Sequence, residues 1–197
     1  MRKWRMLLFV TGMLLAGCSE EASPPDEQEV ESTDEVTVSE YPLFNDEKNR
    51  LILSHMDVLD GGAVRISEPV QASASYEVWS NGKLIEGGGG HFQDGEIEII
   101  SFSLRESSME IGKKTLTFVY NDESASSNDI AAEPEAESFR SSTMLVEKED
   151  TLSRDERKPV WGYTATDEDT ILIRKPEDVQ KAEYGVLVFI QKGEPEE

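Results

Sequence analysis

Apolar and polar residues alternate through most of the middle of this chain, and this period-two pattern constrains the fold more than any other feature. Side chains on successive strand residues point to opposite faces, so such alternation predicts β-strands with one buried face. In the clearest example the apolar positions are Ala72, Ala74, Tyr76 and Val78. Asn81-Gly82 follows this segment and suits the positive φ angles of a two-residue hairpin. The residues from 83 to 86 are therefore expected to return beside the first strand.

Further short segments share this pattern and are separated by turn residues. The expected strands cover 51–56, 64–66, 96–104, 115–120, 143–147, 160–166, 170–174 and 184–191. Asp60-Gly61-Gly62 is expected to be a tight turn, and the run Gly87 to Gly90 is expected to end the pairing because glycine weakens strands. The apolar phase changes near Ile99, which predicts a β-bulge there. Pro176 suits the first position of one or two helical turns.

About nine short strands without long helical periodicity predict a mainly β protein. We expect a single antiparallel β-sandwich, immunoglobulin-like or jelly-roll-like, with a partly closed barrel as the alternative. Two acidic stretches interrupt the pattern. Residues 19–40 contain Pro24-Pro25 and few apolar residues, which predicts a flexible tether, and residues 121–142 are rich in Ser, Ala and Glu, which predicts a mobile loop. In the alternative for the second stretch, residues 131–139 form a short helix or become ordered on a partner.

The first eighteen residues have the composition of an export signal. Arg2, Lys3 and Arg5 precede an apolar run over residues 6–16, and small residues lead to Cys18. A membrane-spanning helix needs roughly twenty residues, so a retained transmembrane segment is the weaker interpretation of this run.

The segment Leu14-Leu15-Ala16-Gly17-Cys18 resembles the lipobox of bacterial lipoproteins. The resemblance implies cleavage before Cys18 and attachment of lipid to its sulfur. The chain is also similar to small uncharacterised lipoproteins of Gram-positive, bacillus-like bacteria, which implies an outward-facing location on the cell membrane. Ser19 follows the cysteine, so the aspartate that commonly retains diderm lipoproteins in the inner membrane is absent. If the source is a diderm bacterium, the sequence does not decide between its inner and outer membranes.

These observations divide the chain into four expected parts. Residues 1–17 are the signal peptide, and 18–40 are the lipidated cysteine and acidic tether. Residues 41–193 form the β-sandwich domain with the acidic loop 121–142, and 194–197 are a flexible tail.

The charge and the cysteine content exclude several classes of function. The chain has 41 acidic and 19 basic residues, and loss of the signal peptide leaves 16 basic residues and a formal charge of −25. Such a field repels phosphates, so nucleic acid is not an expected partner. Cys18 is the only cysteine, so a lipidated chain has no thiol for a disulfide, a nucleophile or a metal site.

The candidate chemical motifs are weak, and no catalytic, cofactor-binding or metal-binding residue is assigned. A zinc site would combine His55 or His91 with carboxylates, and His91 after four glycines is a candidate base, but no Gly-x-Ser-x-Gly motif supplies a nucleophile. Gly87 to Gly90 precede no helix that could hold phosphate. Asp167-Glu168-Asp169 could bind calcium weakly but lack the spacing of an EF-hand.

The aromatic residues Trp79, Trp161 and Tyr163 could stack on sugars if they were exposed, although core packing is favoured. We therefore expect a membrane-anchored, non-catalytic binding module of the cell envelope, with Cys18 as the lipid-attachment site. Its partner is an envelope protein, a wall polymer or a small ligand. The alternative is a secreted hydrolase that uses His91 with carboxylates. A two-lobed solute-binding protein fits less well, because its alternation of strands and long helices is missing.

Overall fold

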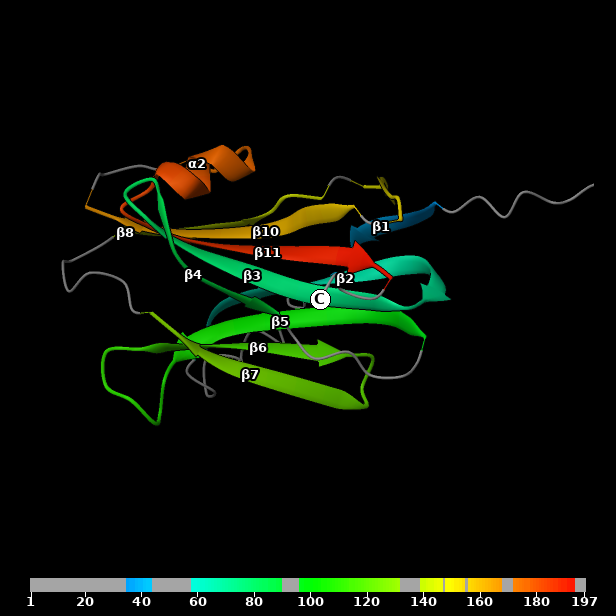
Figure 1. Ribbon diagram of the computed structural model, residues 1–197, viewed down its shortest axis with the longest axis horizontal. Coiled ribbons are helices and arrows are strands. Elements are labelled where there is room, and N and C mark those ends of the chain that lie inside the picture. Colours follow the sequence, from blue (N-terminus) through cyan, green and yellow to red (C-terminus); the bar gives the residue numbers. More distant parts are fainter. Residues whose placement is uncertain are drawn as a thin grey trace, which may run out of the picture. The chain divides into compact units, whose positions relative to one another are not determined.

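The computed structural model describes residues 35–43, 58–89, 96–131, 139–146, 148–154, 156–167 and 172–193. These residues form two antiparallel β-sheets that pack against each other around one core (Figure 1). The predicted fold class, a mainly β protein with a single antiparallel β-sandwich, is confirmed.

The two sheets differ in strand number, and their strands are interleaved along the chain. The first has the order β7-β6-β5-β2-β1-β9, and the second has the order β4-β3-β11-β10-β8. The strands of the first sheet are β1 (Val36–Glu40), β2 (Val58–Val70), β5 (Ile97–Glu106), β6 (Lys114–Tyr120), β7 (Ser124–Ile130) and β9 (Asp150–Leu152). The strands of the second sheet are β3 (Ala72–Ser80), β4 (Lys83–Gly89), β8 (Phe139–Met144), β10 (Arg157–Thr166) and β11 (Tyr184–Lys192), and the helix α2 covers Pro176–Lys181.

The hairpin of β3 and β4 forms as predicted, but β4 is longer than expected. Asn81 and Gly82 have φ angles of 50° and 78°. The prediction that the glycine run ends the pairing is wrong for the glycines that the structure describes, since the residues from Gly87 to Gly89 pair with β3. A Cβ on Gly88 would lie 2.9 Å from the ring of Tyr76, so glycine allows this ring to pack against the strand.

The predicted turn at Asp60-Gly61-Gly62 is also wrong, because these residues lie inside β2 opposite β5. Close packing explains why residue 62 is a glycine, because a Cβ on Gly62 would lie 2.8 Å from the ring of Phe102. Asp60 accepts a hydrogen bond from the hydroxyl of Ser142 on β8, which joins the two sheets. The expected strand over 51–56 lies outside the described residues.

An irregularity near Ile99, where a bulge is predicted, is confirmed, but the extra residues lie on β2 between Arg65 and Val70. The pairing of β5 with β2 is irregular between Ile99 and Ile97. Asn121, with a φ of 52°, stabilises this distortion, because its Oδ1 accepts hydrogen bonds from the N–H groups of Glu98 and Ile99 at 3.0 and 3.1 Å.

Both stretches expected to be unstructured contain strands. Residues 124–130 and 139–142 belong to β7 and β8, and residues 36–40 form β1 within the expected tether. The valines of β1, Val36 and Val38, are buried. The small polar residues of β7 suit an edge strand, where Thr117 and Ser127 form a cross-strand hydrogen bond of 2.9 Å. Residues 132–138 lie outside the described part, and 172–174 of the strand expected over 170–174 are not in a strand.

Aromatic rings fill the core between the sheets. The ring of Trp161 lies 5.5 Å from that of Phe102 and 6.1 Å from that of Tyr163, and Tyr163 makes an edge contact with Tyr184. Trp161 and Tyr163 are buried, which confirms core packing for both, whereas Trp79 is half-buried on the outer face of its sheet.

The helix α2 lies on the outer face of the second sheet, over β10 and β11 (Figure 1). It begins at Pro176, as predicted. Val179 is fully buried against the strands. A Cβ on Gly162 would lie 2.6 Å from the side chain of Val179, and one on Gly185 would overlap its carbonyl oxygen. Glycine at both strand positions therefore permits the close approach of the helix.

Candidate interaction surface

The loop of residues 107–113, between β5 and β6, exposes two large apolar side chains. Met109 is 88% exposed and Ile111 is fully exposed, more than any other large apolar side chain in the described part of the chain. We call residues 107–113 the tip loop. The next most exposed apolar side chains, Leu172, Leu84 and Phe139, lie between 53% and 63% exposure.

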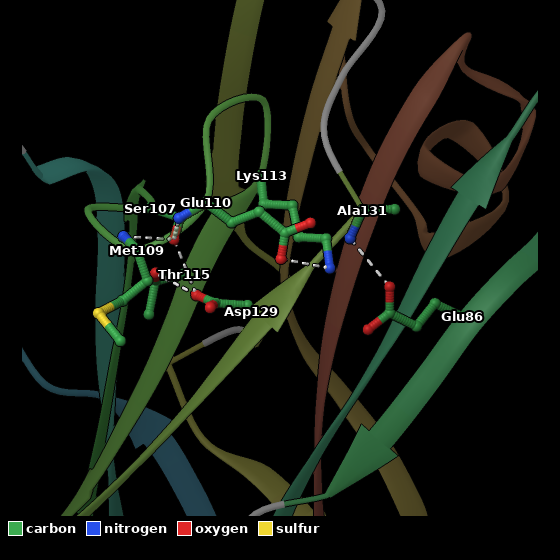
Figure 2. A network of polar contacts seen from close by, with 8 residues as sticks. All are labelled: Glu86, Ser107, Met109, Glu110, Lys113, Thr115, Asp129 and Ala131. Atoms are coloured by element: carbon green, nitrogen blue, oxygen red, sulfur yellow. Dashed lines mark hydrogen bonds and ion pairs between the residues drawn. The ribbon is translucent and has the colours of Figure 1, made fainter.

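Side-chain hydrogen bonds fix the first half of the tip loop (Figure 2). The hydroxyl of Ser107 accepts from the N–H groups of Met109 and Glu110, both at 3.2 Å. The same hydroxyl donates to the carboxylate of Asp129 on β7 at 3.2 Å, and Thr115 donates to that carboxylate at 2.7 Å. The backbone of Met109 is thus held through Ser107 by a neighbouring strand.

The second half of the loop is closed by backbone and charged contacts. Ser107 and Lys113 are joined by a backbone hydrogen bond of 2.9 Å, and Gly112 has a φ of 83°. The ammonium group of Lys113 lies 2.9 Å from the carboxylate of Glu110 (Figure 2), and this hydrogen bond raises the pKa of Lys113. Ile111 lies in the sequence between Glu110 and Lys113, which are paired with each other.

Opposite charges also pair below the loop. The buried ammonium group of Lys114 lies 2.9 Å from the carboxylate of Glu106, and Arg140 approaches the same carboxylate at 4.0 Å. The apolar side chains of the tip loop therefore stand beside paired charges, although the chain as a whole is strongly acidic.

A contact between the sheets holds the strand that carries Asp129. At the end of β7, the N–H of Ala131 donates to Glu86 on β4 at 2.9 Å (Figure 2), and its carbonyl accepts from the hydroxyl of Tyr184 on β11 at 2.7 Å. Tyr76 donates to the other oxygen of Glu86 at 3.1 Å. Burial, together with this hydrogen bond and the charge of Glu86, raises the pKa of Tyr76 to about 12. We call these contacts the Ala131 clasp.

The tip loop and the start of β1 lie at opposite ends of the first sheet. The end of β5 that leads into the loop pairs with the start of β2, where Arg105 faces Val58. The beginning of β1 lies toward the other end of β2, since Val38 pairs with Ile66 and the N–H of Thr37 donates to Ser67. Figure 1 shows the same separation between β1 and the green loop that joins β5 to β6.

The residues singled out from the sequence do not assemble into a reactive site in the part of the chain that the structure describes. Cys18, His55 and His91 lie outside that part. Asp167 is described and its N–H donates to Glu183 at 2.9 Å, but the other two residues of its acidic cluster are outside the described ranges. Within those ranges, no three His, Cys, Asp or Glu side chains are grouped so that they could hold a metal ion.

The sequence contained a weak signal for the tip loop. Met109 and Ile111 stand two positions apart in a segment of Ser, Glu and Gly between two alternating strands, where apolar residues have no inward face to occupy. The contact with Asp129 could not be predicted, because it joins residues 22 positions apart.

No described helix has the length and apolar character needed to cross a membrane. Comparisons with protein-family models, curated proteins and solved structures gave no significant match to the chain.

Proposed function

We propose that this chain is a lipid-anchored, outward-facing binding module of the bacterial cell envelope, and that the tip loop contacts a protein partner. The segment that resembles a lipobox and ends at Cys18 supports the anchor, and the tip loop supports the contact. The proposal assigns no catalytic role to the chain.

The observation that carries the proposal is the presentation of Met109 and Ile111 by a loop with a fixed backbone. Exposed apolar side chains contribute little to folding, whereas burial in a partner stabilises a complex by about 2 kcal/mol for each such side chain. The hydrogen bonds of Ser107 reduce the entropy that the loop would lose on binding.

The chemistry of the loop favours protein over the other expected partners. Aliphatic side chains such as those of Met109 and Ile111 offer no ring on which a sugar could stack. A membrane is disfavoured because the mature chain has a formal charge of −25, which repels anionic headgroups. An apolar groove on another protein matches both side chains, and methionine adapts readily to such grooves.

The position of the tip loop within the first sheet suits this role. Because the tip loop lies at the end of the sheet remote from the start of β1, the end that docks is not the end at which β1 begins.

Photocrosslinking on intact cells tests the proposed contact. A photoreactive amino acid is placed at Ile111 of the full chain, and the matched control carries it at Ile85 of β4, which is 49% exposed. We expect a discrete protein adduct from position 111 that is absent from position 85. Equal adducts from both positions, or none from position 111, would contradict the proposal.

A further inference from the structure

We propose that Met109 is an oxidation site, and that conversion of its thioether to the sulfoxide switches the tip loop from an apolar to a polar surface. The oxidation site follows from the geometry of the loop. The loss of docking on oxidation rests on the proposed function.

The thioether of Met109 is open to solvent and is presented by a fixed backbone. The residue is 88% exposed, and its N–H is bonded to Ser107. Figure 2 shows its side chain directed away from the ion pair of Glu110 and Lys113. Methionine oxidation requires access of the oxidant to the sulfur, so this position is favourable.

The second methionine of the described residues provides an internal control. Met144 on β8 is half-buried and packs against the core. Its sulfur lies on the inner side of the sheet, close to Gly62 and near the ring of Phe102, so a Cβ on Gly62 would be 2.5 Å from the sulfur. The same chemical group is thus exposed at position 109 and shielded at position 144.

The reaction with a peroxide is balanced as follows. The sulfur of Met109 attacks one peroxide oxygen, the O–O bond breaks and an S–O bond forms. The sulfur loses two electrons, and the peroxide is reduced to water after proton transfer. The product is a polar hydrogen-bond acceptor in place of an apolar group, so it disfavours an apolar groove. The fold is spared, because the side chain of Met109 contributes almost no buried surface.

The first experiment measures oxidation rates on the purified full chain with hydrogen peroxide, followed by peptide mass spectrometry. In the folded chain we expect Met109 to be oxidised at least about tenfold faster than Met144, and we expect the two rates to converge in concentrated urea. A folded-state rate for Met109 equal to or below that of Met144 would overturn the oxidation site.

The second experiment tests whether oxidation weakens docking. It measures the yield of the photocrosslinked adduct from position 111 on intact cells with and without peroxide. We expect peroxide to reduce this adduct in the wild-type chain relative to untreated cells. In Met109→Leu, which has no oxidisable sulfur at this position, we expect treated and untreated cells to give the same yield. Met109→Gln, which resembles the sulfoxide in polarity, is expected to reduce the adduct without peroxide. An adduct unaffected by oxidation of the wild-type chain would overturn the switch.

The two arms separate the proposals. If the untreated wild-type chain gives no adduct, the proposed docking function and the switch fail together. The peptide oxidation rates still decide whether Met109 is the oxidation site.

Discussion

At the residue scale, the Ala131 clasp shows how single polar groups join the two sheets. Both backbone groups of Ala131 are bound by side chains of the second sheet, Glu86 and Tyr184. Because Ala131 follows directly on β7, the clasp also positions Asp129, which holds the tip loop. The periodicity of β3 predicted the inward side of Tyr76, but no local pattern could predict a carboxylate that bonds 45 residues away.

Removal of one clasp partner should destabilise the domain. In Tyr184→Phe the carbonyl of Ala131 loses its hydrogen-bond donor. In Glu86→Gln the side chain keeps only one acceptor oxygen, so either the N–H of Ala131 or the hydroxyl of Tyr76 faces the amide NH₂ group and loses its acceptor. We expect each change to lower the free energy of unfolding in urea by about 1 kcal/mol. The control Tyr41→Phe removes a hydroxyl from a ring that is not buried and should change it by less than about 0.5 kcal/mol. Equal effects of all three variants would contradict the role of the clasp.

Alkaline pH should weaken the same contacts. The pKa of Tyr76 is about 12 in the folded chain against 10.0 for an ordinary tyrosine. Above pH 10 the unfolded chain loses this proton first, so the stabilisation is complete below pH 10 and is lost as the pH rises toward 12. We expect the melting temperature to fall over this interval and to fall less in Tyr76→Phe. The buried Tyr120, whose pKa is also raised, should leave part of the dependence in that variant.

At the scale of elements, alternation predicted most strands, and the errors arose at glycines and in acidic or small polar segments. The irregular pairing near Ile99 and the start of α2 at Pro176 were predicted because each has a local signal. Gly61 and Gly62 resemble a turn in sequence but serve close packing inside β2. The strand β7 was missed because its small polar residues match those of a loop, and its pairing with β6 is what orders them.

The docking of α2 should depend on the absence of side chains at two strand positions. Gly185→Ala places a methyl group against the carbonyl of Val179. We expect it to lower the free energy of unfolding by about 2 kcal/mol, since the helix must move away from the sheet. The matched control is Gly89→Ala, whose methyl group would meet its nearest atom, in Ala74, at an ordinary 3.5 Å. Urea denaturation of both variants measures the difference, and similar losses would contradict this account of α2.

At the scale of the whole molecule, the tip loop and the start of β1 lie at opposite ends of the first sheet of the sandwich. The sequence predicted the sandwich because strand signals recur at short intervals. It did not predict the tip loop as a surface, since the exposure of Met109 and Ile111 depends on how β5, β6 and β7 come together.

The anchor has its own test. In cells given labelled palmitate, we expect the wild-type chain to incorporate label and to remain with the membrane fraction. Cys18→Ser removes the sulfur that would carry lipid and should abolish the label. Recovery of unlabelled wild-type chain from the cytosol with its first seventeen residues intact would contradict the anchor.

The most direct test of the central claim is the strength of docking when the tip loop is made polar. A photoreactive residue at Glu110 of the full chain reports adduct formation on intact cells in three backgrounds: wild type, Met109→Ser with Ile111→Ser, and Leu84→Ser with Ile85→Ser. Loss of two buried apolar contacts predicts a roughly tenfold lower adduct yield in the variant with Met109→Ser and Ile111→Ser. The second, which changes an exposed apolar pair on β4, should match the wild type. Equal yields in all three backgrounds would contradict the assignment of the tip loop as the binding surface.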